Sequence, residues 1–292
     1  MENLNGIIVI NKPKEYTSHD VVAKVKKILN IKKVGHTGTL DPNATGVLPL
    51  LLNDGTKLSK YLINHDKEYK VTLQLGIKTD TADGEGKIIK KEAVDISILD
   101  KVEEVLKSFI GKQKQVPPMY SAIKVNGKKL YEYAREGKNV ELEPRNIEIY
   151  DIKLEKLDKE KEEIQFIVSC SKGTYIRSLC EDIAEKLGTV GYMKELQRTK
   201  VGEFKLEQAI TIEQLEQNLD NIQNNIITME VLLKNNEKII LTEKKLTLFL
   251  NGVMINIYNK DGIYQIYDVY NKYIGTGIIK SNKLKRDIIL TR

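Results

Sequence analysis

The stretch from Gly35 to Pro49 reads GHTGTLDPNATGVLP and is crowded with glycine, threonine, asparagine and proline. Such residues favour turns, so the stretch predicts an ordered loop that leads into the apolar run Val47 to Leu52. Asp41 is the one acidic residue of this loop. An Asp-Pro pair ordinarily initiates a turn, which is one interpretation of Asp41. Long turn-rich loops also carry functional residues, so Asp41 is a candidate for chemistry.

Strands and helices are predicted to alternate irregularly on both sides of this loop. Period-two or continuous apolar patterns predict strands over residues 6–11, 70–77, 87–91, 147–157 and 164–169. Helical spacing predicts helices over residues 18–29, 99–110 and 176–187. Ser18 is expected to be the N-cap of the first helix, and TDTADGEG is expected to turn a hairpin. Because no regular βαβ repeat appears, we expect an α+β fold with a mixed, largely antiparallel sheet flanked by helices.

The end of the chain has a different character from the rest. Residues 217–225 are polar and rich in asparagine, and the chain beyond Asn235 predicts short strands. Breaks between these strands are expected at Asn251-Gly252, at Asp261-Gly262 and from Gly275 to Gly277. We therefore predict one domain over residues 1–230 and a small β-rich module over residues 231–292. A module of this size would be only marginally stable alone, so we expect it to pack on the first domain.

Composition excludes several classes of protein. Hydrophobic residues make up 41% and charged residues 30% of the 292 residues, which is typical of a globular protein and argues against general disorder. No apolar run approaches the roughly 18 residues of a membrane span, and the opening Met1-Glu2-Asn3 lacks the pattern of a signal peptide. A cytoplasmic protein that does not associate with membranes is the expectation.

The sequence offers no pattern for a metal or a cofactor. Cys170 and Cys180 have no close cysteine or histidine neighbours, and His19, His36 and His65 are scattered. Neither GxxxxGK[ST] nor GxGxxG occurs. We expect catalysis without a cofactor and without a metal.

Net charge gives a weak indication of the partner. Lys and Arg number 47 against 41 Asp and Glu, a balance of +6. A basic balance favours polyanionic partners, although a chain rich in Lys, Ile and Asn can acquire it from biased composition.

Several blocks of sequence together resemble one enzyme family. GHTGTLDPNATGVLP, KEYKVTLQLGIKTDTADGEG, QVPPMYSAIKVNGKKLYEYAREG and CSKGTYIRSL look like the blocks of the tRNA pseudouridine-55 synthases, the TruB family, in the family's order. The resemblance runs from about Gly6 to Phe204 and is thinner beyond residue 230. It implies a pseudouridine synthase-like fold with a PUA-like C-terminal module. Two residues depart from the family's pattern: Glu15 replaces a glycine, and Gln197 replaces an arginine.

The resemblance implies an activity and a set of site residues. The family isomerises uridine 55 in the TΨC loop of tRNA, flipping the base out before a carboxylate attacks it; Asp41 stands at the position of that carboxylate. Arg177 is expected beside it to keep it ionised, although an arbitrary helix arginine is more often a surface residue. Tyr69, Tyr175 and Leu196 match positions that line the nucleotide pocket, with a core role as the plain alternative for each. His36 is a candidate to fill the space that the flipped base vacates.

A basic segment of about residues 112–145 is expected to clamp RNA. The candidates for this role are Lys124, Lys128, Lys129 and Arg135. They could contact phosphates of the TΨC arm or could be solvated residues of a lysine-rich turn. We expect a monomeric enzyme with tRNA as its partner.

Two other functions compete with this interpretation. A non-catalytic RNA-binding or RNA-folding protein would also be basic, but it would not need Asp41, Tyr69 and Arg177. A carboxylate-dependent glycosidase usually needs a second carboxylate matched to the first, and the loop around Asp41 contains none. Whether Asp41 attacks C6 of uracil or C1′ of ribose stays open, because both routes need the same ionised carboxylate.

Overall fold

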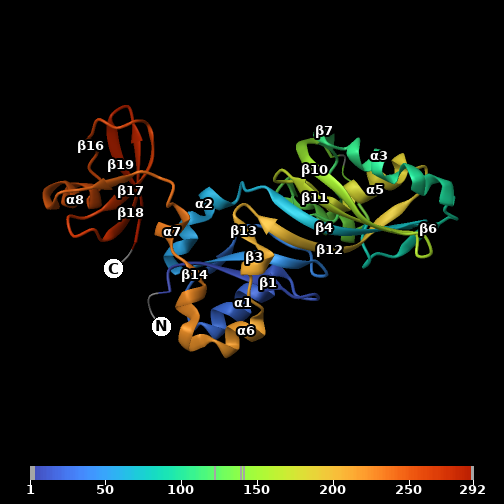
Figure 1. Cartoon of the computed structure of the whole chain (residues 1–292), viewed down its shortest axis with the longest axis horizontal. Helices are drawn as coiled ribbons and strands as arrows, with labels where there is room; N and C mark the ends of the chain where they lie inside the picture. The colour runs from blue at the N-terminus through green and yellow to red at the C-terminus, as the bar shows by residue number, and fades with distance from the viewer. Residues whose placement is uncertain (1–3, 122, 139, 141, 291–292) are drawn as a thin grey trace.

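A computed structural model describes residues 4–121, 123–138, 140 and 142–290. Its centre is a ten-stranded sheet in the order β14-β1-β3-β12-β4-β11-β10-β7, with β2 paired to β3 and β13 paired to β12. A separate five-stranded sheet near the C-terminus lies at the far end of the molecule from α3 and α5 (Figure 1).

The strands of the large sheet are β1 (Gly6–Lys12), β2 (Val34–His36), β3 (Thr45–Leu52), β4 (Lys67–Leu75), β7 (Gly111–Gln115), β10 (Arg145–Asp158), β11 (Glu163–Cys170), β12 (Gly191–Val201), β13 (Phe204–Lys205) and β14 (Ile226–Ile227). Two small hairpins are formed by β5 (Ile77–Thr79) with β6 (Ile88–Lys91) and by β8 (Lys124–Val125) with β9 (Lys128–Lys129). The α-helices are α1 (Ser18–Ile28), α2 (Ser59–Leu62), α3 (Val102–Lys107), α4 (Leu130–Arg135), α5 (Ile176–Lys186), α6 (Ile212–Gln217), α7 (Met229–Leu232) and α8 (Glu243–Leu250). Strands β15 to β19 belong to the C-terminal sheet and are given below.

The predicted mixed, largely antiparallel sheet is confirmed. Every ladder between described strands of the large sheet is antiparallel except that between β3 and β12. Gly46 of β3 faces Arg198 of β12 there, and a Cβ on Gly46 would lie 2.2 Å from the Arg198 carbonyl oxygen. Only glycine at this position therefore lets β3 and β12 approach each other closely. Their contact joins the strands β14, β1 and β3 to the strands from β12 to β7 in one sheet.

Helices cover the sheet in two groups. Residues of α1 and α6 pack with β1 and β3 in one buried cluster, whereas α3 and α5 pack with β4, β10, β11 and β12 in another. Helix α1 begins with a capping box in which Thr17 and Asp20 exchange hydrogen bonds. The prediction that Ser18 is the N-cap is therefore wrong by one residue, because the Ser18 side chain bonds to Leu40 instead.

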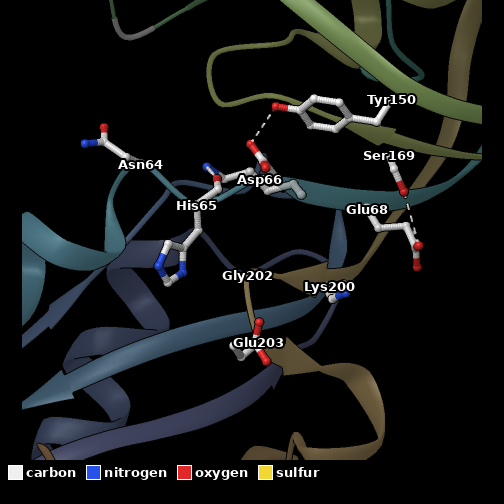
Figure 2. Close-up of a pocket in the computed structure, with 10 residues that line it drawn as sticks. Asn64, His65, Asp66, Glu68, Tyr150, Ser169, Lys200, Gly202 and Glu203 are labelled. Carbon is white, nitrogen blue, oxygen red and sulfur yellow. Dashed lines mark hydrogen bonds between the residues drawn. The ribbon is translucent and has the colours of Figure 1, made fainter. Parts of the chain in front are cut away.

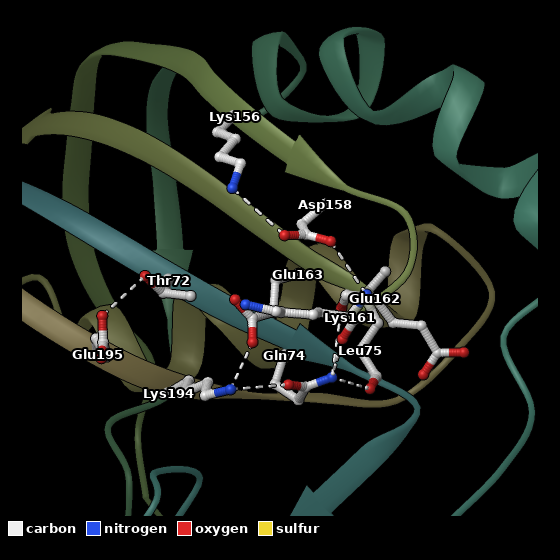
Figure 3. Close-up of polar contacts among 10 residues, drawn as sticks. All are labelled: Thr72, Gln74, Leu75, Lys156, Asp158, Lys161, Glu162, Glu163, Lys194 and Glu195. Atoms are coloured by element: carbon white, nitrogen blue, oxygen red, sulfur yellow. Dashed lines mark hydrogen bonds and ion pairs between the residues drawn. The ribbon is translucent and has the colours of Figure 1, made fainter.

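Polar side chains join the neighbouring strands β4, β11 and β12 (Figure 3). Gln74 donates to the carbonyl oxygen of Lys161 at 2.8 Å, and Lys194 forms an ion pair with Glu163 at 2.5 Å. Both Gln74 and Glu163 are buried, so these contacts satisfy polar groups inside the structure. They fix the register of the strands that carry Tyr69 and Leu196.

The predicted hairpin around TDTADGEG is formed by β5 and β6, with Ile77 opposite Lys91. The expected strand over residues 70–77 is in fact two strands, because Gly76 (φ +75°) turns the chain between β4 and β5. Strand β12, which was not predicted, is the centre of the large sheet.

The C-terminal sheet contains β15 (Lys238–Ile240), β16 (Ile255–Asn256), β17 (Gly262–Tyr267), β18 (Tyr273–Lys280) and β19 (Lys283–Ile289). Helix α8 was not predicted, and Asn251-Gly252 ends this helix. The predicted break from Gly275 to Gly277 is wrong: these residues lie inside β18, where a Cβ on Gly275 would meet the Ile288 carbonyl oxygen at 2.0 Å. Close packing of two strands, and not a turn, is the reason for glycine here.

Strand β19 packs the C-terminal sheet against the large sheet and α2. Ile288 is buried in the same cluster as Ile7 and Val9 of β1. Asp287 accepts hydrogen bonds from Lys60 and Tyr61, and Lys57 donates to the Ile289 carbonyl oxygen at 2.8 Å.

Candidate active site

Five of the predicted site residues line a single cavity of about 440 Å³. They come from four elements that are distant in sequence: Asp41 from the loop before β3, Tyr69 from β4, Leu196 from β12, and Tyr175 and Arg177 from the start of α5. Tyr120 and Tyr131 of the basic segment form another wall. A volume of a few hundred Å³ is typical of a site for a small molecule or one nucleotide.

Asp41 and Arg177, which both line the cavity, form an ion pair. The Nε atom of Arg177 lies 3.2 Å from Oδ2 of Asp41, and its Nη2 atom donates to Oδ1 at 3.3 Å. The Arg177 side chain is 9% exposed, whereas the Asp41 side chain is 38% exposed. A two-point contact of this kind fixes the plane of a carboxylate. The acid therefore remains accessible from the cavity, while its cationic partner is buried behind it.

Asp83 is a second carboxylate at the same guanidinium, and the sequence reasoning missed it. The Nη1 atom of Arg177 lies 3.5 Å from Oδ2 of Asp83, which belongs to the turn TDTADGEG. Thr81 and the Glu85 backbone donate to the other oxygen of Asp83, at 2.5 and 3.1 Å. The concentration of Asp80, Asp83 and Glu85 in one turn is the signal in the sequence that points to this carboxylate. Asp83 holds the guanidinium from the side opposite Asp41.

The pKa of the Asp41 carboxyl is raised above its ordinary value. Burial is the largest cause, because it disfavours the charged form, and the negative charge of Asp83 adds to it. Arg177 and Lys12 act in the opposite direction. The ionisation of Asp41 therefore depends on Arg177, which is the first of the groups that stabilise its charged form.

The backbone around Asp41 is held on both sides by side chains of other elements. Ser18 accepts a hydrogen bond from the Leu40 amide at 2.9 Å and donates to the Leu40 carbonyl oxygen at 3.2 Å. Lys12, which is fully buried, donates to the Pro42 carbonyl oxygen at 2.8 Å. Burial lowers the pKa of Lys12 to about 8. These contacts preorganise the loop before any substrate binds.

Arg198 supports the backbone of the same loop and is 1% exposed. It donates to the carbonyl oxygens of Val47 at 2.8 Å, Gly38 at 3.2 Å and Thr39 at 3.4 Å. The sequence reasoning also missed this role, although a long basic side chain between the apolar Leu196 and Val201 was a signal. An interior guanidinium that binds three carbonyl groups fixes the path of the chain towards Asp41.

Replacing Arg198 by methionine is expected to lower the free energy of unfolding by about 3 kcal/mol, because three carbonyl groups lose their donor inside the protein. Urea unfolding followed by far-ultraviolet circular dichroism measures the loss. The matched control is Arg286→Met, since Arg286 is exposed and donates only to the Leu250 carbonyl oxygen among described contacts. Equal losses for the two variants would contradict the supporting role of Arg198.

Tyr69 lies directly opposite Arg198 in the pairing of β4 with β12. Burial raises the pKa of the Tyr69 hydroxyl to about 12, although its hydrogen bond from Arg198 works against this shift. The neutral phenol is therefore favoured throughout the physiological range. Its ring faces the cavity as an apolar surface, and its hydroxyl remains a hydrogen-bonding group.

His36 lies outside the cavity, at the end of β2 and two residues before Gly38. Burial lowers the pKa of its imidazole, so the neutral form is favoured. A neutral ring at the edge of the loop has the chemical character needed to replace a stacked base, but the structure does not bring it among the lining residues.

The basic segment forms a short hairpin followed by α4. Asn126 and Gly127 both have positive φ at the turn between β8 and β9, as a two-residue hairpin requires. Lys124 is exposed, whereas Lys128 pairs with Glu136 and lies 4.9 Å from the centre of the Tyr133 ring. Lys129 lies 5.3 Å from the centre of the Tyr131 ring. The side chain of Arg135 lies outside the described part of the structure.

Figure 2 shows a second hollow, of about 450 Å³. Lys67 lines both this hollow and the cavity that contains Asp41. Two of the acidic residues of the hollow accept hydrogen bonds from neighbours: Tyr150 donates to Asp66 at 3.1 Å, and Thr199 donates to Glu68 at 2.8 Å. The side chains of Lys200 and Glu203 give it mixed charge. It offers no pairing of an accessible acid with a buried guanidinium like that of Asp41 and Arg177 among the described residues.

The two departures from the family pattern have simple structural contexts. Glu15 has φ +68°, so it adopts the left-handed turn that a glycine would adopt most easily. Gln197 is half-buried on β12 and pairs with Thr45 and Lys70, outside the cavity lining. Neither departure reaches the pair formed by Asp41 and Arg177.

No group of three or more His, Cys, Asp and Glu side chains among the described residues is arranged to hold a metal ion. None of the helices in the described ranges has the length and apolar character needed to cross a membrane.

Comparison with known families gives two matches in sequence. Residues 26–176 match the model of the TruB family pseudouridylate synthase N-terminal domain, and residues 177–238 match that of the tRNA pseudouridylate synthase B C-terminal domain. The tRNA pseudouridine synthase B of Alkaliphilus oremlandii is 47% identical over 285 residues, which cover 95% of this chain and 94% of that protein. The protein of the same name from Clostridium novyi is 46% identical, and the match covers 98% of this chain and all of that protein.

Comparison with solved structures agrees with the sequence matches. A crystal structure of a Cbf5-Nop10-Gar1 complex contains a chain that superposes with a TM-score of 0.69 at 26% identity. The superposition covers 99% of this chain and 84% of that chain.

Proposed function

This chain belongs to the TruB family of pseudouridylate synthases, and we propose that it isomerises a uridine of tRNA to pseudouridine. The similarity to proteins named tRNA pseudouridine synthase B extends over nearly the full length of this chain, which supports the activity and the tRNA substrate. The enzyme is then an isomerase, because the reactant and the product have the same atoms.

The finer proposal is that the target is uridine 55 in the TΨC arm and that Asp41 is the nucleophile. The observation that carries it is the cavity in which an accessible Asp41 is paired with the buried Arg177, and which Tyr69 and Tyr175 also line. A uridine that is stacked inside an RNA loop cannot reach this acid. The uridine must therefore be flipped out of the loop and into the cavity.

The reaction needs a covalent catalyst and no redox change. The bond between ribose C1′ and uracil N1 breaks, and a bond between C1′ and C5 forms. The C5 proton leaves to water, and N1 gains a proton. Asp41 would hold one of the two fragments during the rearrangement, by attack at C6 or at C1′, and would be released as a carboxylate at the end. Arg177 would stabilise that carboxylate at both ends of the cycle.

The other predicted residues take supporting roles in this proposal. Tyr69 would stack on the uracil and assist proton transfer through its neutral hydroxyl, which Arg198 orients. Tyr175 and Leu196 would enclose the flipped base. His36, at the start of the catalytic loop, would fill the space that the base leaves in the RNA.

Tritium release from tRNA labelled at C5 of uridine tests the activity, and chemical mapping of the product tests the position. Release by the wild-type protein from position 55 is the expected result. Absence of release, with tRNA binding intact, would instead favour a non-catalytic tRNA-binding or tRNA-folding protein. Family membership together with the Asp41–Arg177 pair does not favour that alternative.

Lys124 is proposed to contact an RNA phosphate, because it is exposed on the hairpin next to the cavity wall. Lys124→Ala is expected to weaken tRNA binding and to reduce the slope of log K against log salt by about 1. Filter binding at several salt concentrations measures the slope. Lys26→Ala on the exposed face of α1 is the control, and an equal change of slope in both variants would contradict a specific contact.

The proposal also includes the organisation of the chain. Residues 1–230 would form the catalytic domain, with the basic segment of about residues 112–145 as its RNA clamp, and residues 231–292 would form a PUA-like domain. We propose a monomeric cytoplasmic enzyme.

A further inference from the structure

Gln115 makes an unusual contact with the backbone of a cavity residue. Its side-chain oxygen accepts a hydrogen bond from the Tyr175 amide at 2.8 Å, and its side-chain nitrogen donates to the Tyr175 carbonyl oxygen at 3.0 Å. Gln115 is the last residue of β7 and is 4% exposed. One buried amide thus satisfies both backbone groups of one residue, which fixes the position and the rotation of that peptide segment.

Tyr175 is the N-cap of α5, so its position determines where this helix begins. Its backbone is extended (φ −98°, ψ 112°), and its side chain makes no capping hydrogen bond. The Tyr175 carbonyl oxygen also accepts the hydrogen bond of the Leu179 amide, which belongs to the first turn of the helix. Gln115 therefore ties the residue that begins α5 to the edge of the sheet.

The chain that follows Gln115 makes two more contacts with the first turn of α5. Ser178 donates to the Val116 carbonyl oxygen at 3.1 Å, and the Nη2 atom of Arg177 donates to the Tyr120 carbonyl oxygen at 2.9 Å. Residues 115–120 then continue into the hairpin and α4 of the basic segment. The segment that carries the proposed RNA clamp and the turn that carries Arg177 are therefore joined at three points.

From this arrangement we infer that Gln115 is a positioning residue for the reaction: it sets the location of Tyr175 and, through the first turn of α5, the contact of Arg177 with Asp41. The inference rests on the proposed function. Gln115 does not line the cavity itself and contacts the backbone of Tyr175, so it acts through that backbone and not on the substrate. A displacement of the reacting groups by about 1 Å can lower a rate by a factor of the order of 10².

Gln115→Ala and Gln115→Met are expected to lower the single-turnover rate of tritium release about 100-fold at saturating tRNA, with little change in Kd. The acid limb of the rate profile is expected to move to higher pH, because Arg177 no longer lies at its position beside Asp41. Gln113→Ala is the matched control: Gln113 is on the same strand, and its amide donates to the Phe109 carbonyl oxygen at 2.8 Å. Met retains the length of the side chain, so it serves as the test if the alanine variant does not fold.

Gln115→Glu adds a second readout. A neutral carboxylic acid can accept from the Tyr175 amide and donate to its carbonyl oxygen as glutamine does, whereas an ionised one cannot donate. The rate of this variant relative to wild type is therefore expected to rise as the pH is lowered. Wild-type rates and acid limbs in the Ala and Met variants, or a loss equal to that of Gln113→Ala, would overturn the role of Gln115 while leaving the proposed function intact. Absence of tritium release by the wild type would overturn both.

Discussion

Asp41→Asn is expected to lower the rate of pseudouridine formation by at least about 10⁴-fold, because the amide has the shape of the carboxylate but is not a nucleophile. The contacts that hold the loop involve the backbone of Leu40, Pro42, Gly38 and Thr39, so they survive the substitution. Binding of tRNA is expected to be unchanged or slightly tighter, since one negative charge is removed from an RNA-binding cavity.

Single-turnover tritium release and filter binding, measured on the same preparation, separate these two effects. Asp220→Asn is the matched control, because Asp220 is exposed in the polar stretch before β14. Residual activity of Asp41→Asn close to that of the control would remove Asp41 from the mechanism. Loss of binding together with activity would indicate that Asp41 has a structural role in the loop.

Arg177→Met is expected to lower the rate by a factor of about 10² to 10³ and to move the acid limb of the pH profile to higher pH. The sign follows from the ion pair: Arg177 lowers the pKa of Asp41 against the larger effect of burial, so its removal raises that pKa further. More Asp41 is then protonated, and inactive, at any pH near the limb. Arg177→Lys is expected to restore little, because a lysine cannot reproduce the two-point contact.

Asp83→Asn provides a test of opposite sign. The negative charge of Asp83 raises the pKa of Asp41, so its removal is expected to move the acid limb to lower pH even if the rate falls. Single-turnover rates measured from mildly acidic to neutral pH give the acid limb for the wild type, for Arg177→Met and for Asp83→Asn. An acid limb that stays in place in both variants would show that it does not report Asp41.

The sequence predicted those features that are encoded by short segments. The turn-rich composition from Gly35 to Gly46 predicted a loop, and helical spacing after Tyr175 predicted α5. Local composition failed at two places in the C-terminal module: α8 stands where a strand was predicted, and β18 is continuous across the break predicted from Gly275 to Gly277. At Gly275 the glycine serves a close approach between strands, which a single sequence does not distinguish from a turn.

The sequence by itself determined the fold class, the family resemblance and the candidates Asp41, Arg177, Tyr69 and Tyr175, because each of these residues lies in a block with its own recognisable pattern. Leu196 was a candidate through its match to a pocket position of the family. Only the tertiary structure revealed Asp83, Lys12, Arg198 and Gln115 as supports of these candidates. These four act through contacts with residues that are far away along the chain, such as Arg198 with Gly38 and Gln115 with Tyr175. Long-range hydrogen bonds of buried polar groups leave no periodic pattern in the sequence, so their partners are decided when the sheet and α5 pack together.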